Sequence, residues 1–314
     1  MNCDGIGLRV LRWVPTLLLG FALGACSGPQ FAPAEPPVLA QGTAGQVWSD
    51  GQGELAFEVF GERGDDRPAI LFLHGWCENR GFWKPTAAAL AKDAFCVTVD
   101  LPGYGGSGRD GGKPDPVVWA GRMAAFAREQ HAGDWVVVGH SLGGVVALET
   151  ARALKESARG VVVVHGLYDP ARRFDAAMNR DFGEALGRDF PGQIDAFVEA
   201  LVPKRTSGAL TGWVAAQMKR TDPDVAVAGL GALENYEIEP CLADLRIPVR
   251  AINAKMRATN LAANRRMIRD FEVLILESIQ GSGLDLMLLD PTGFRALLAK
   301  SLEPMGVIVR PDQP

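Results

Sequence analysis

One predicted strand–turn–helix segment constrains the fold more than any other part of this 314-residue chain. It begins with the apolar run Trp135–Val138, which is short and β-branched and therefore predicts a buried strand. Gly139–Gly143 follows as Gly-His-Ser-Leu-Gly, and Val145–Leu154 has the pattern of a helix. So tight a turn needs small residues around it. It raises the Ser141 hydroxyl above the sheet edge and directs the Leu142 N–H toward the same space.

Strands and helices alternate along the rest of the chain. Strands are predicted at 46–48, 55–60, 69–75, 95–99, 135–138, 160–164, 247–253 and 272–276, and helices near 81–92, 116–131, 145–154, from 261 onward and at 291–302. Alternation of this kind implies right-handed crossovers and an α/β fold with a doubly wound, mostly parallel sheet. The first two strands form a hairpin, because a short Ser-Asp-Gly-Gln-Gly turn joins them.

Three turns at predicted strand ends resemble motifs of one known family. Gly-His-Ser-Leu-Gly-Gly144 is similar to the nucleophile elbow of the α/β-hydrolase family, and His74-Gly75-Trp76 is similar to its His-Gly-x turn. The segment from Asp100 to Ser107 matches the family's Asp-x-Pro-Gly-x-Gly-x-Ser loop. The resemblance covers about Trp48 to Leu302 and implies serine hydrolysis of an ester or amide.

The resemblance also assigns roles to these residues. Ser141 occupies the nucleophile position, and the N–H groups of Trp76 and Leu142 are the expected oxyanion donors. Gly75 belongs to the same turn, and His74 is expected to be structural rather than a base. Asp100 is expected to shape the wall of the site and not to serve as the triad acid.

Residues 167–240 fall where the family inserts a helical cap over its site. Helices are predicted there at 176–186, 193–201 and 210–219. Their large apolar side chains, Phe182, Phe197, Trp213 and Met218, have two interpretations, as the lining of a pocket or as packing of the cap on the core, and the second is favoured. The hydrolase core is expected at 46–166 and 241–304, followed by a C-terminal tail at 305–314.

The triad implied by the resemblance is incomplete. The acid is expected within a few residues of Asn253, where this chain carries Lys255 and Arg257 instead. Counting back from Asp290-Pro291, which suits the start of a helix, places Leu284 at the histidine position. The last histidine of the chain is His165. A serine without a base is a poor nucleophile near neutral pH, so we expect little or no hydrolysis.

Two substitutes for the missing base stay open. His165 follows a predicted strand beside the elbow strand, and Asp169 lies four residues later, so they form an alternative base and acid. A histidine with a structural role at the cap hinge is favoured over that alternative. The second substitute is a Ser-Lys dyad with Lys255, which has no support in the sequence. Asp285, beside Leu284, is expected to face solvent or to cap a turn.

The N-terminus predicts export and lipidation. Arg9 and Arg12 precede an apolar run that ends in Leu-Gly-Ala-Cys26, which resembles a bacterial lipobox. Residues 1–25 are therefore predicted to be a lipoprotein signal peptide, with Cys26 as the lipid-bearing first residue and 26–45, rich in Pro and Ala, as a tether. The protein would then be lipid-anchored in a bacterial cell envelope, facing outside the cytoplasm.

The amino-acid composition limits the kinds of molecule that the protein is expected to bind. A formal charge of −5 without basic runs argues against nucleic acid, and scattered histidines give no metal-ligand spacing, so neither metal nor cofactor is predicted. Cys77, Cys96 and Cys241 allow at most one disulfide, of undetermined pairing. The favoured function is a weak or inactive family member that binds a small acyl, ester or amide ligand or serves as a scaffold, its protein partner unknown. The alternative is an active hydrolase that uses His165.

Overall fold

The computed structural model describes residues 45–64, 68–130, 133–172, 176–204, 206–234, 236–255, 258–280 and 284–309. The predicted signal peptide, Cys26, nearly all of the tether, Arg257 and the last residues of the predicted tail lie outside these ranges. Within the described ranges, no helix is long and apolar enough to cross a membrane.

Eight strands form one sheet, in the order β1-β2-β4-β3-β5-β6-β7-β8. The strands are β1 Gln46–Ser49, β2 Glu54–Phe60, β3 Ala69–Leu73, β4 Cys96–Val99, β5 Trp135–His140, β6 Ala158–Val164, β7 Val249–Lys255 and β8 Phe271–Gln280. β2 pairs antiparallel with β1 and β4, and the pairs from β4 through β8 are parallel. The predicted hairpin and mostly parallel sheet are therefore confirmed.

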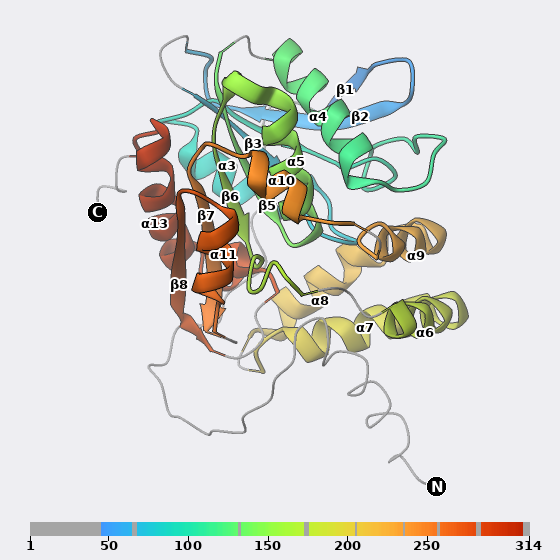
Figure 1. The fold of residues 1–314 in the computed structure, drawn as a ribbon. Helices are drawn as coiled ribbons and strands as arrows, with labels where there is room; N and C mark the ends of the chain where they lie inside the picture. The colour runs from blue at the N-terminus through green and yellow to red at the C-terminus, as the bar shows by residue number, and fades with distance from the viewer. Residues whose placement is uncertain are drawn as a thin grey trace, which may run out of the picture.

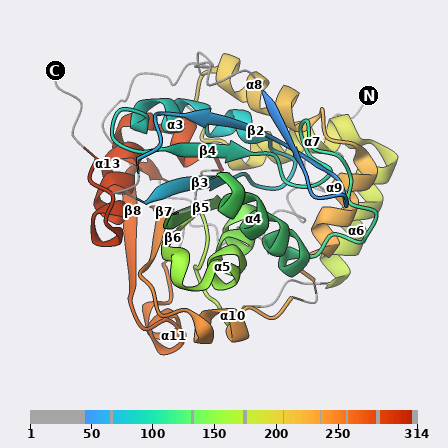
Figure 2. The ribbon, with the colours of Figure 1, turned by 90° about the horizontal axis from the view of Figure 1, so that it is seen from above.

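Helices cover both faces of this sheet. They are η1 Arg80–Phe82, α3 Lys84–Leu90, α4 Pro116–Gln130, α5 Leu142–Leu154, η2 Lys155–Ser157, α6 Ala176–Arg188, α7 Phe190–Leu201, α8 Gly208–Met218, α9 Pro223–Gly231, α10 Glu239–Asp244, α11 Leu261–Met267, α12 Leu286–Leu289, α13 Pro291–Leu302 and η3 Glu303–Met305. Figure 2 shows α3 and α13 on one face and α4 and α5 on the other, which is the doubly wound arrangement that the alternating pattern predicts.

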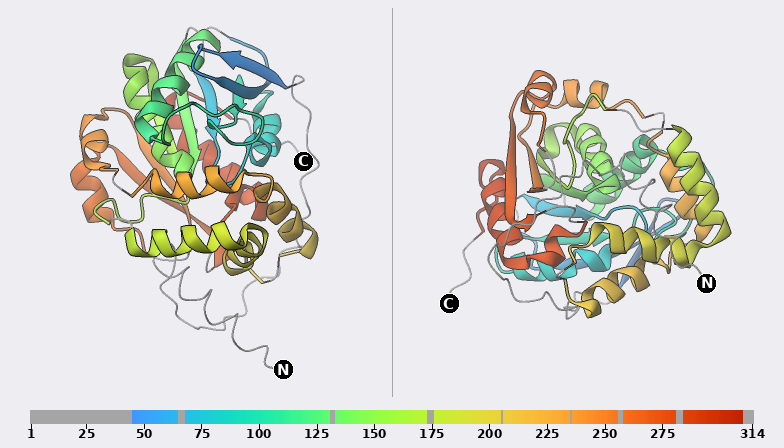
Figure 3. Two further views of the ribbon diagram at one scale, coloured as in Figure 1. Left: turned by 90° about the vertical axis from the view of Figure 1, so that its right-hand side faces the viewer. Right: turned by 90° about the horizontal axis from the view of Figure 1, so that it is seen from below.

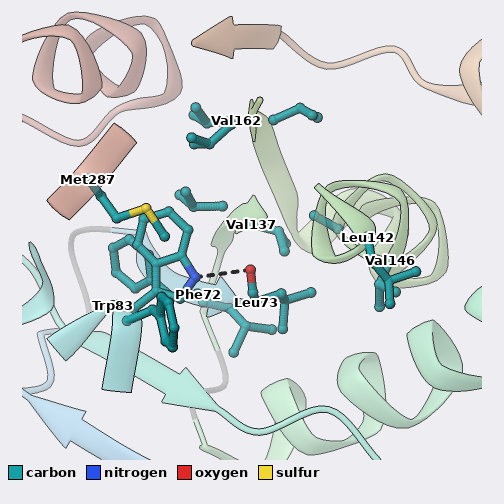
Figure 4. Packing of buried hydrophobic residues seen from close by; sticks show 14 of the residues in the cluster. Phe72, Leu73, Trp83, Val137, Leu142, Val146, Val162 and Met287 are labelled. Atoms are coloured by element: carbon teal, nitrogen blue, oxygen red, sulfur yellow. Dashed lines mark hydrogen bonds between the residues drawn. The ribbon is translucent and has the colours of Figure 1, made fainter. Parts of the chain in front are cut away.

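The central strands are buried on both sides, as their continuous apolar sequences require. All residues of β3 and β5 are buried. Phe72 of β3 packs against Trp83 with ring centroids 5.1 Å apart, and the Trp83 indole N–H donates to the Leu73 carbonyl at 3.0 Å (Figure 4). That bond satisfies the polar atom of a fully buried tryptophan, so burial of this large ring stabilises the sheet without an unpaired donor.

Four helices between β6 and β7, α6 to α9, lie together at one end of the sheet (Figures 1 and 3). They occupy the segment predicted as a helical cap. The last of them, α9, is not among the predicted helices, because Asp222-Pro223 resembles a break between helices. Asp222 is instead its N-cap, with a side chain that accepts from the Asp224 N–H, and Pro223 is a favourable first residue.

The three described cysteines, Cys77, Cys96 and Cys241, are buried free thiols. Burial raises the pKa of each of them, which keeps the thiols protonated near neutral pH. The bridge that the sequence left open is not formed among them.

Candidate active site

The predicted nucleophile elbow forms at the junction of β5 and α5. Ser141 adopts φ 50° and ψ −114°, a conformation that costs energy for a residue with a Cβ. Its N–H donates to the Val164 carbonyl of β6 at 2.9 Å, which fixes the turn against the sheet. A Cβ on Gly139 would overlap the Gly143 carbonyl, so the helix can fold back on the strand only because residue 139 is a glycine.

The two predicted oxyanion donors belong to adjacent segments. Leu142 is the first residue of α5, so its N–H has no acceptor within the helix. A Cβ on Gly143 would overlap the His74 carbonyl and lie 2.6 Å from the Leu73 carbonyl oxygen, which places the start of α5 directly against the end of β3. Trp76 follows two residues later in that loop. The donor assignment itself stays a prediction.

Trp76 also connects the core to the cap. Its indole N–H donates to the Ala226 carbonyl of α9 at 2.7 Å. Its ring packs against Phe182 of α6 and Phe197 of α7, with centroids 5.9 and 5.3 Å away. These two cap side chains, Phe182 and Phe197, thus hold the cap on the loop that carries Trp76.

The remaining two side chains of that set also pack. Trp213 of α8 lies against Phe82 with ring centroids 5.1 Å apart, and Met218 is buried. The packing interpretation therefore accounts for all four cap side chains.

His74 and Asp100 hold loops in place, as expected. The His74 ring accepts from the Leu101 N–H at Nε2, 2.9 Å away, so its Nδ1 carries the proton that it donates to the Gly75 carbonyl. Burial lowers the pKa of His74, outweighing the nearby Asp100 charge, and keeps the ring neutral. Asp100 accepts from the backbone N–H groups of Arg80 and Gly106 and also pairs with the Arg80 guanidinium.

The two positions where the family resemblance places an acid and a histidine have other functions here. Leu284 is buried and belongs to the apolar core, so its side chain can neither accept nor donate a proton. Lys255 ends β7, is 63% exposed and forms an ion pair with Glu277 at 3.0 Å. A lysine so exposed is not the desolvated base that a Ser-Lys dyad requires.

His140, directly before the nucleophile position, is fully buried between two acceptors. Its Nδ1 lies 2.8 Å from Glu78 Oε1 and its Nε2 lies 2.8 Å from the Leu284 carbonyl. A neutral imidazole has a single N–H, so facing two acceptors favours the doubly protonated ring. Burial alone would lower the pKa of His140, but the Glu78 charge and hydrogen bond, with help from Asp285, raise it to about 9. This ring therefore has no free lone pair for a serine proton.

Asp285 corrects an expectation. It is expected from the sequence to face solvent or cap a turn, yet it is 1% exposed, and its side chain forms no cap bond to α12. It lies beside Glu78 and His140, because its neighbours Leu284 and Leu286 are themselves buried and carry it inward. Burial and the charge of Glu78 raise the pKa of Asp285 well above its usual range. Glu78 is absent from the predicted site, because no motif of the sequence marks it.

The alternative base and acid are placed as follows. His165 is buried at the end of β6 with φ 57°, and its ring centroid lies 6.0 Å from that of His140 and 5.7 Å from that of Tyr168. Asp169 accepts from the Ala171 N–H at 3.1 Å and from the Asn260 amide at 3.2 Å. Both oxygens of Asp169 are thus engaged by its own turn and by the start of α11. The assignment of His165 as base stays untested.

Comparison with known proteins gives a consistent picture. A model of the alpha/beta hydrolase family matches residues 70–299. Pimeloyl-(acyl-carrier protein) methyl ester esterase of Xanthomonas campestris pv. campestris is 31% identical over 191 residues, 58% of this chain and 73% of that protein. The enol-lactonase from Burkholderia xenovorans LB400 superposes with a TM-score of 0.72 at 15% identity, covering 82% of this chain and 100% of the other. A thermophilic esterase from Thermogutta terrifontis gives 0.71 at 21% identity, covering 84% and 100%. The chain belongs to the alpha/beta hydrolase family.

Proposed function

We propose that this protein binds an acyl, ester or amide group at the Ser141 elbow and hydrolyses it slowly or not at all. The observation that carries the proposal is Leu284, an apolar core side chain at the position where the family resemblance places histidine. Without a base, the serine hydroxyl keeps its proton and no group protonates the leaving alcohol or amine. Loss of the histidine from a Ser-His-Asp unit such as that of subtilisin lowers kcat on the order of 10⁶-fold.

The binding half of the proposal rests on the preserved elbow. The Leu142 N–H at the start of α5 and the nearby Trp76 loop can polarise a carbonyl oxygen whether or not turnover follows. Relatives of this chain are esterases, so an ester or related acyl compound is the ligand class that this arrangement favours.

The decisive experiment compares labelling and turnover. Wild type, Ser141→Ala and His165→Ala are treated with a fluorophosphonate and assayed with short-chain esters. Ser157→Ala on η2, beyond the opposite end of α5, is the serine control. We expect a slow ester rate that is the same in all four proteins. The oxyanion donors can still leave roughly 10³ to 10⁴ over water, and because Ser141→Ala keeps these backbone donors, that residual rate does not depend on the serine. Fast labelling and turnover that Ser141→Ala abolishes would overturn it.

One observation favours a second candidate, an active hydrolase with His165 as the base. The Ser141 N–H bonds to Val164, so the residue after Val164 lies at the same sheet edge as the elbow. His165→Ala decides between the two: loss of a vigorous rate in both Ser141→Ala and His165→Ala, with Ser157→Ala unaffected, would establish this candidate.

Binding is tested independently of turnover. A boronic acid or carboxylate should bind the wild-type protein, and Ser141→Trp should abolish that binding, because an indole would fill the space above the elbow. Calorimetry measures both affinities. Equal affinity in wild type and Ser141→Trp would place the ligand elsewhere and contradict the binding half of the proposal.

We further propose that the protein is lipid-anchored through Cys26 in a bacterial envelope. The support is the lipobox-like Leu-Gly-Ala-Cys26 followed by the Pro- and Ala-rich segment. Replacing Cys26 by Ala should move the protein from the membrane fraction to the soluble fraction. An unchanged membrane fraction, or a mature N-terminus at another residue, would contradict the anchor.

A further inference from the structure

Three ionisable side chains from three separate segments meet beneath the elbow. Glu78 follows β3, His140 ends β5, and Asp285 follows β8. All three are buried, and one ligand-type atom from each lies within 4.8 Å of the others. The sequence could not indicate this cluster, because its members are far apart in the chain and share no ligand spacing.

Asp285 is the part of the cluster that lacks a partner. Among the residues that the structure describes, no backbone or side-chain N–H group donates to either of its carboxylate oxygens, and the group that faces it is another carboxylate, Glu78, although Asp285 is 1% exposed. Burying an ionised carboxylate without a donor is costly, and buried charges are normally paired or bound to a metal. The neighbouring Glu78 carboxylate increases the amount of negative charge that needs a partner, since His140 offers at most one positive charge to two acids.

The other two side chains have outer contacts that leave one atom each facing the cluster. His140 Nε2 is 2.8 Å from the Leu284 carbonyl, which leaves Nδ1 on the inner side. Glu78 Oε2 accepts from the Gly75 N–H at 2.7 Å, which leaves Oε1 beside His140 Nδ1. A histidine that donates one N–H to a carbonyl while its other nitrogen points inward is the usual arrangement of a metal ligand.

We propose that Glu78, His140 and Asp285 bind a first-row divalent cation such as Zn²⁺. Glu78 Oε1, His140 Nδ1 and a bidentate Asp285 carboxylate supply the donor atoms. In a tetrahedral zinc site such atoms lie about 3.3 Å apart, given metal–ligand bonds of about 2.0–2.1 Å. The three groups, whose ligand atoms lie within 4.8 Å of one another, would approach to that separation on binding. The cation replaces the proton on His140 Nδ1, so binding releases protons.

Such a site would be structural. The cation would connect the loop that carries Trp76, the end of the elbow strand and the segment after β8, all at the carboxyl edge of the sheet. It would therefore hold the loop that carries Trp76 in place through Glu78 and Gly75, and Ser141 would not be one of its ligands. This inference does not depend on whether the protein hydrolyses esters.

Calorimetric titration of the chelator-treated full chain with Zn²⁺ alone tests the proposal. We expect one tight site in wild type, and Glu78→Gln and Asp285→Asn should each weaken it at least about 100-fold, because each removes an anionic ligand. Asp244→Asn, at an exposed carboxylate on α10, is the matched control and should leave the affinity unchanged. The proposal would be overturned if wild type bound no Zn²⁺ tightly, or if Glu78→Gln and Asp285→Asn bound it as tightly as wild type does.

Two further measurements guard against a variant that merely misfolds. Co²⁺ bound to wild type should give visible d–d absorption that Asp285→Asn lacks, while the far-UV circular dichroism of the two proteins stays the same. Without metal, the two proteins should have a similar Tm near neutral pH, because the raised pKa keeps the Asp285 carboxyl uncharged, as Asn is. With Zn²⁺ in excess only wild type should gain stability. Equal gains in both proteins would contradict the site.

Discussion

The two sides of the candidate active site differ in what they retain. On the side of β3 and β5, the oxyanion loop and the elbow keep the residues that the family resemblance predicts. On the side of β7 and β8, Lys255 and Leu284 stand where an acid and a histidine are expected. The first side is part of the packing of the fold, because Gly143 must contact the end of β3 for α5 to pack. On the second side, the expected acid and histidine would act in the chemistry and not in the packing. Other residues can therefore stand at these two positions without loss of the fold.

The largest expected effect is a loss of stability caused by a substitution on the first side, in the elbow. Gly143→Val should lower the free energy of unfolding by about 3 kcal/mol or more, because its side chain would overlap the His74 carbonyl. Gly121→Ala in α4, where a Cβ meets nothing within 4 Å, is the control and should instead stabilise by roughly 0.5–1 kcal/mol. Denaturant unfolding of the three proteins measures the contrast; a well-tolerated Gly143→Val would show that the elbow is not required for packing.

The second prediction concerns the cluster that joins the two sides. In chelator-treated protein, the pKa of His140 is raised from 6.5 to about 9. Protonated His140 therefore adds on the order of 3 kcal/mol to the free energy of unfolding. This contribution is complete below pH 6.5 and is lost as the pH rises through about 9. The raised pKa of Asp285 acts in the same direction, because its ionisation is also resisted in the folded state.

Urea unfolding between pH 6 and 10 measures this slope. Glu78→Gln removes the charge that raises the pKa of His140, so it should flatten the curve. His74 and His165 lie near the cluster, and replacing either by Gln should leave this dependence in place. A stability of the wild type that rises with pH over this range would contradict the assignment of the buried imidazolium.

The elbow and the cluster also show what the sequence could and could not predict. The strand, turn and helix around Ser141 are determined by residues that are neighbours in the sequence, so the local pattern is sufficient to predict them. Most strands of the sheet are predictable for the same reason. Helix α12 is not predicted, because its four residues are too few to show periodicity, and α9 is not predicted, because Asp222-Pro223 resembles a break between helices. Asp285 is expected to face solvent or cap a turn, because aspartate usually does. Its position beside Glu78 and His140 joins residues more than 140 positions apart, which no local pattern indicates.

Repair of the second side is the third prediction. Leu284→His alone should change kcat by less than about tenfold, because no carboxylate is placed to orient or stabilise the imidazolium. Leu284→His with Lys255→Asp should raise it roughly tenfold to a hundredfold over wild type, since both triad roles are then supplied. Steady-state ester kinetics, with Ser141→Ala added to each variant as the control, report the outcome. Equal rates in the single and double variants would mean that this end of β7 lies too far from the site to supply the acid.

The smallest expected effect concerns Lys255 itself. Its ion pair with Glu277 joins two side chains that are 63% and 66% exposed, and such pairs contribute little because water and salt screen them. Lys255→Ala should therefore change the free energy of unfolding by less than about 0.5 kcal/mol and leave the fluorophosphonate reactivity of Ser141 unchanged. Glu277→Ala is the matched control and should behave alike. A tenfold fall in reactivity for Lys255→Ala but not for Glu277→Ala would mean that the lysine reaches the serine. Lys255 at the end of β7 would then act as a base, at the position where the family resemblance places an acid.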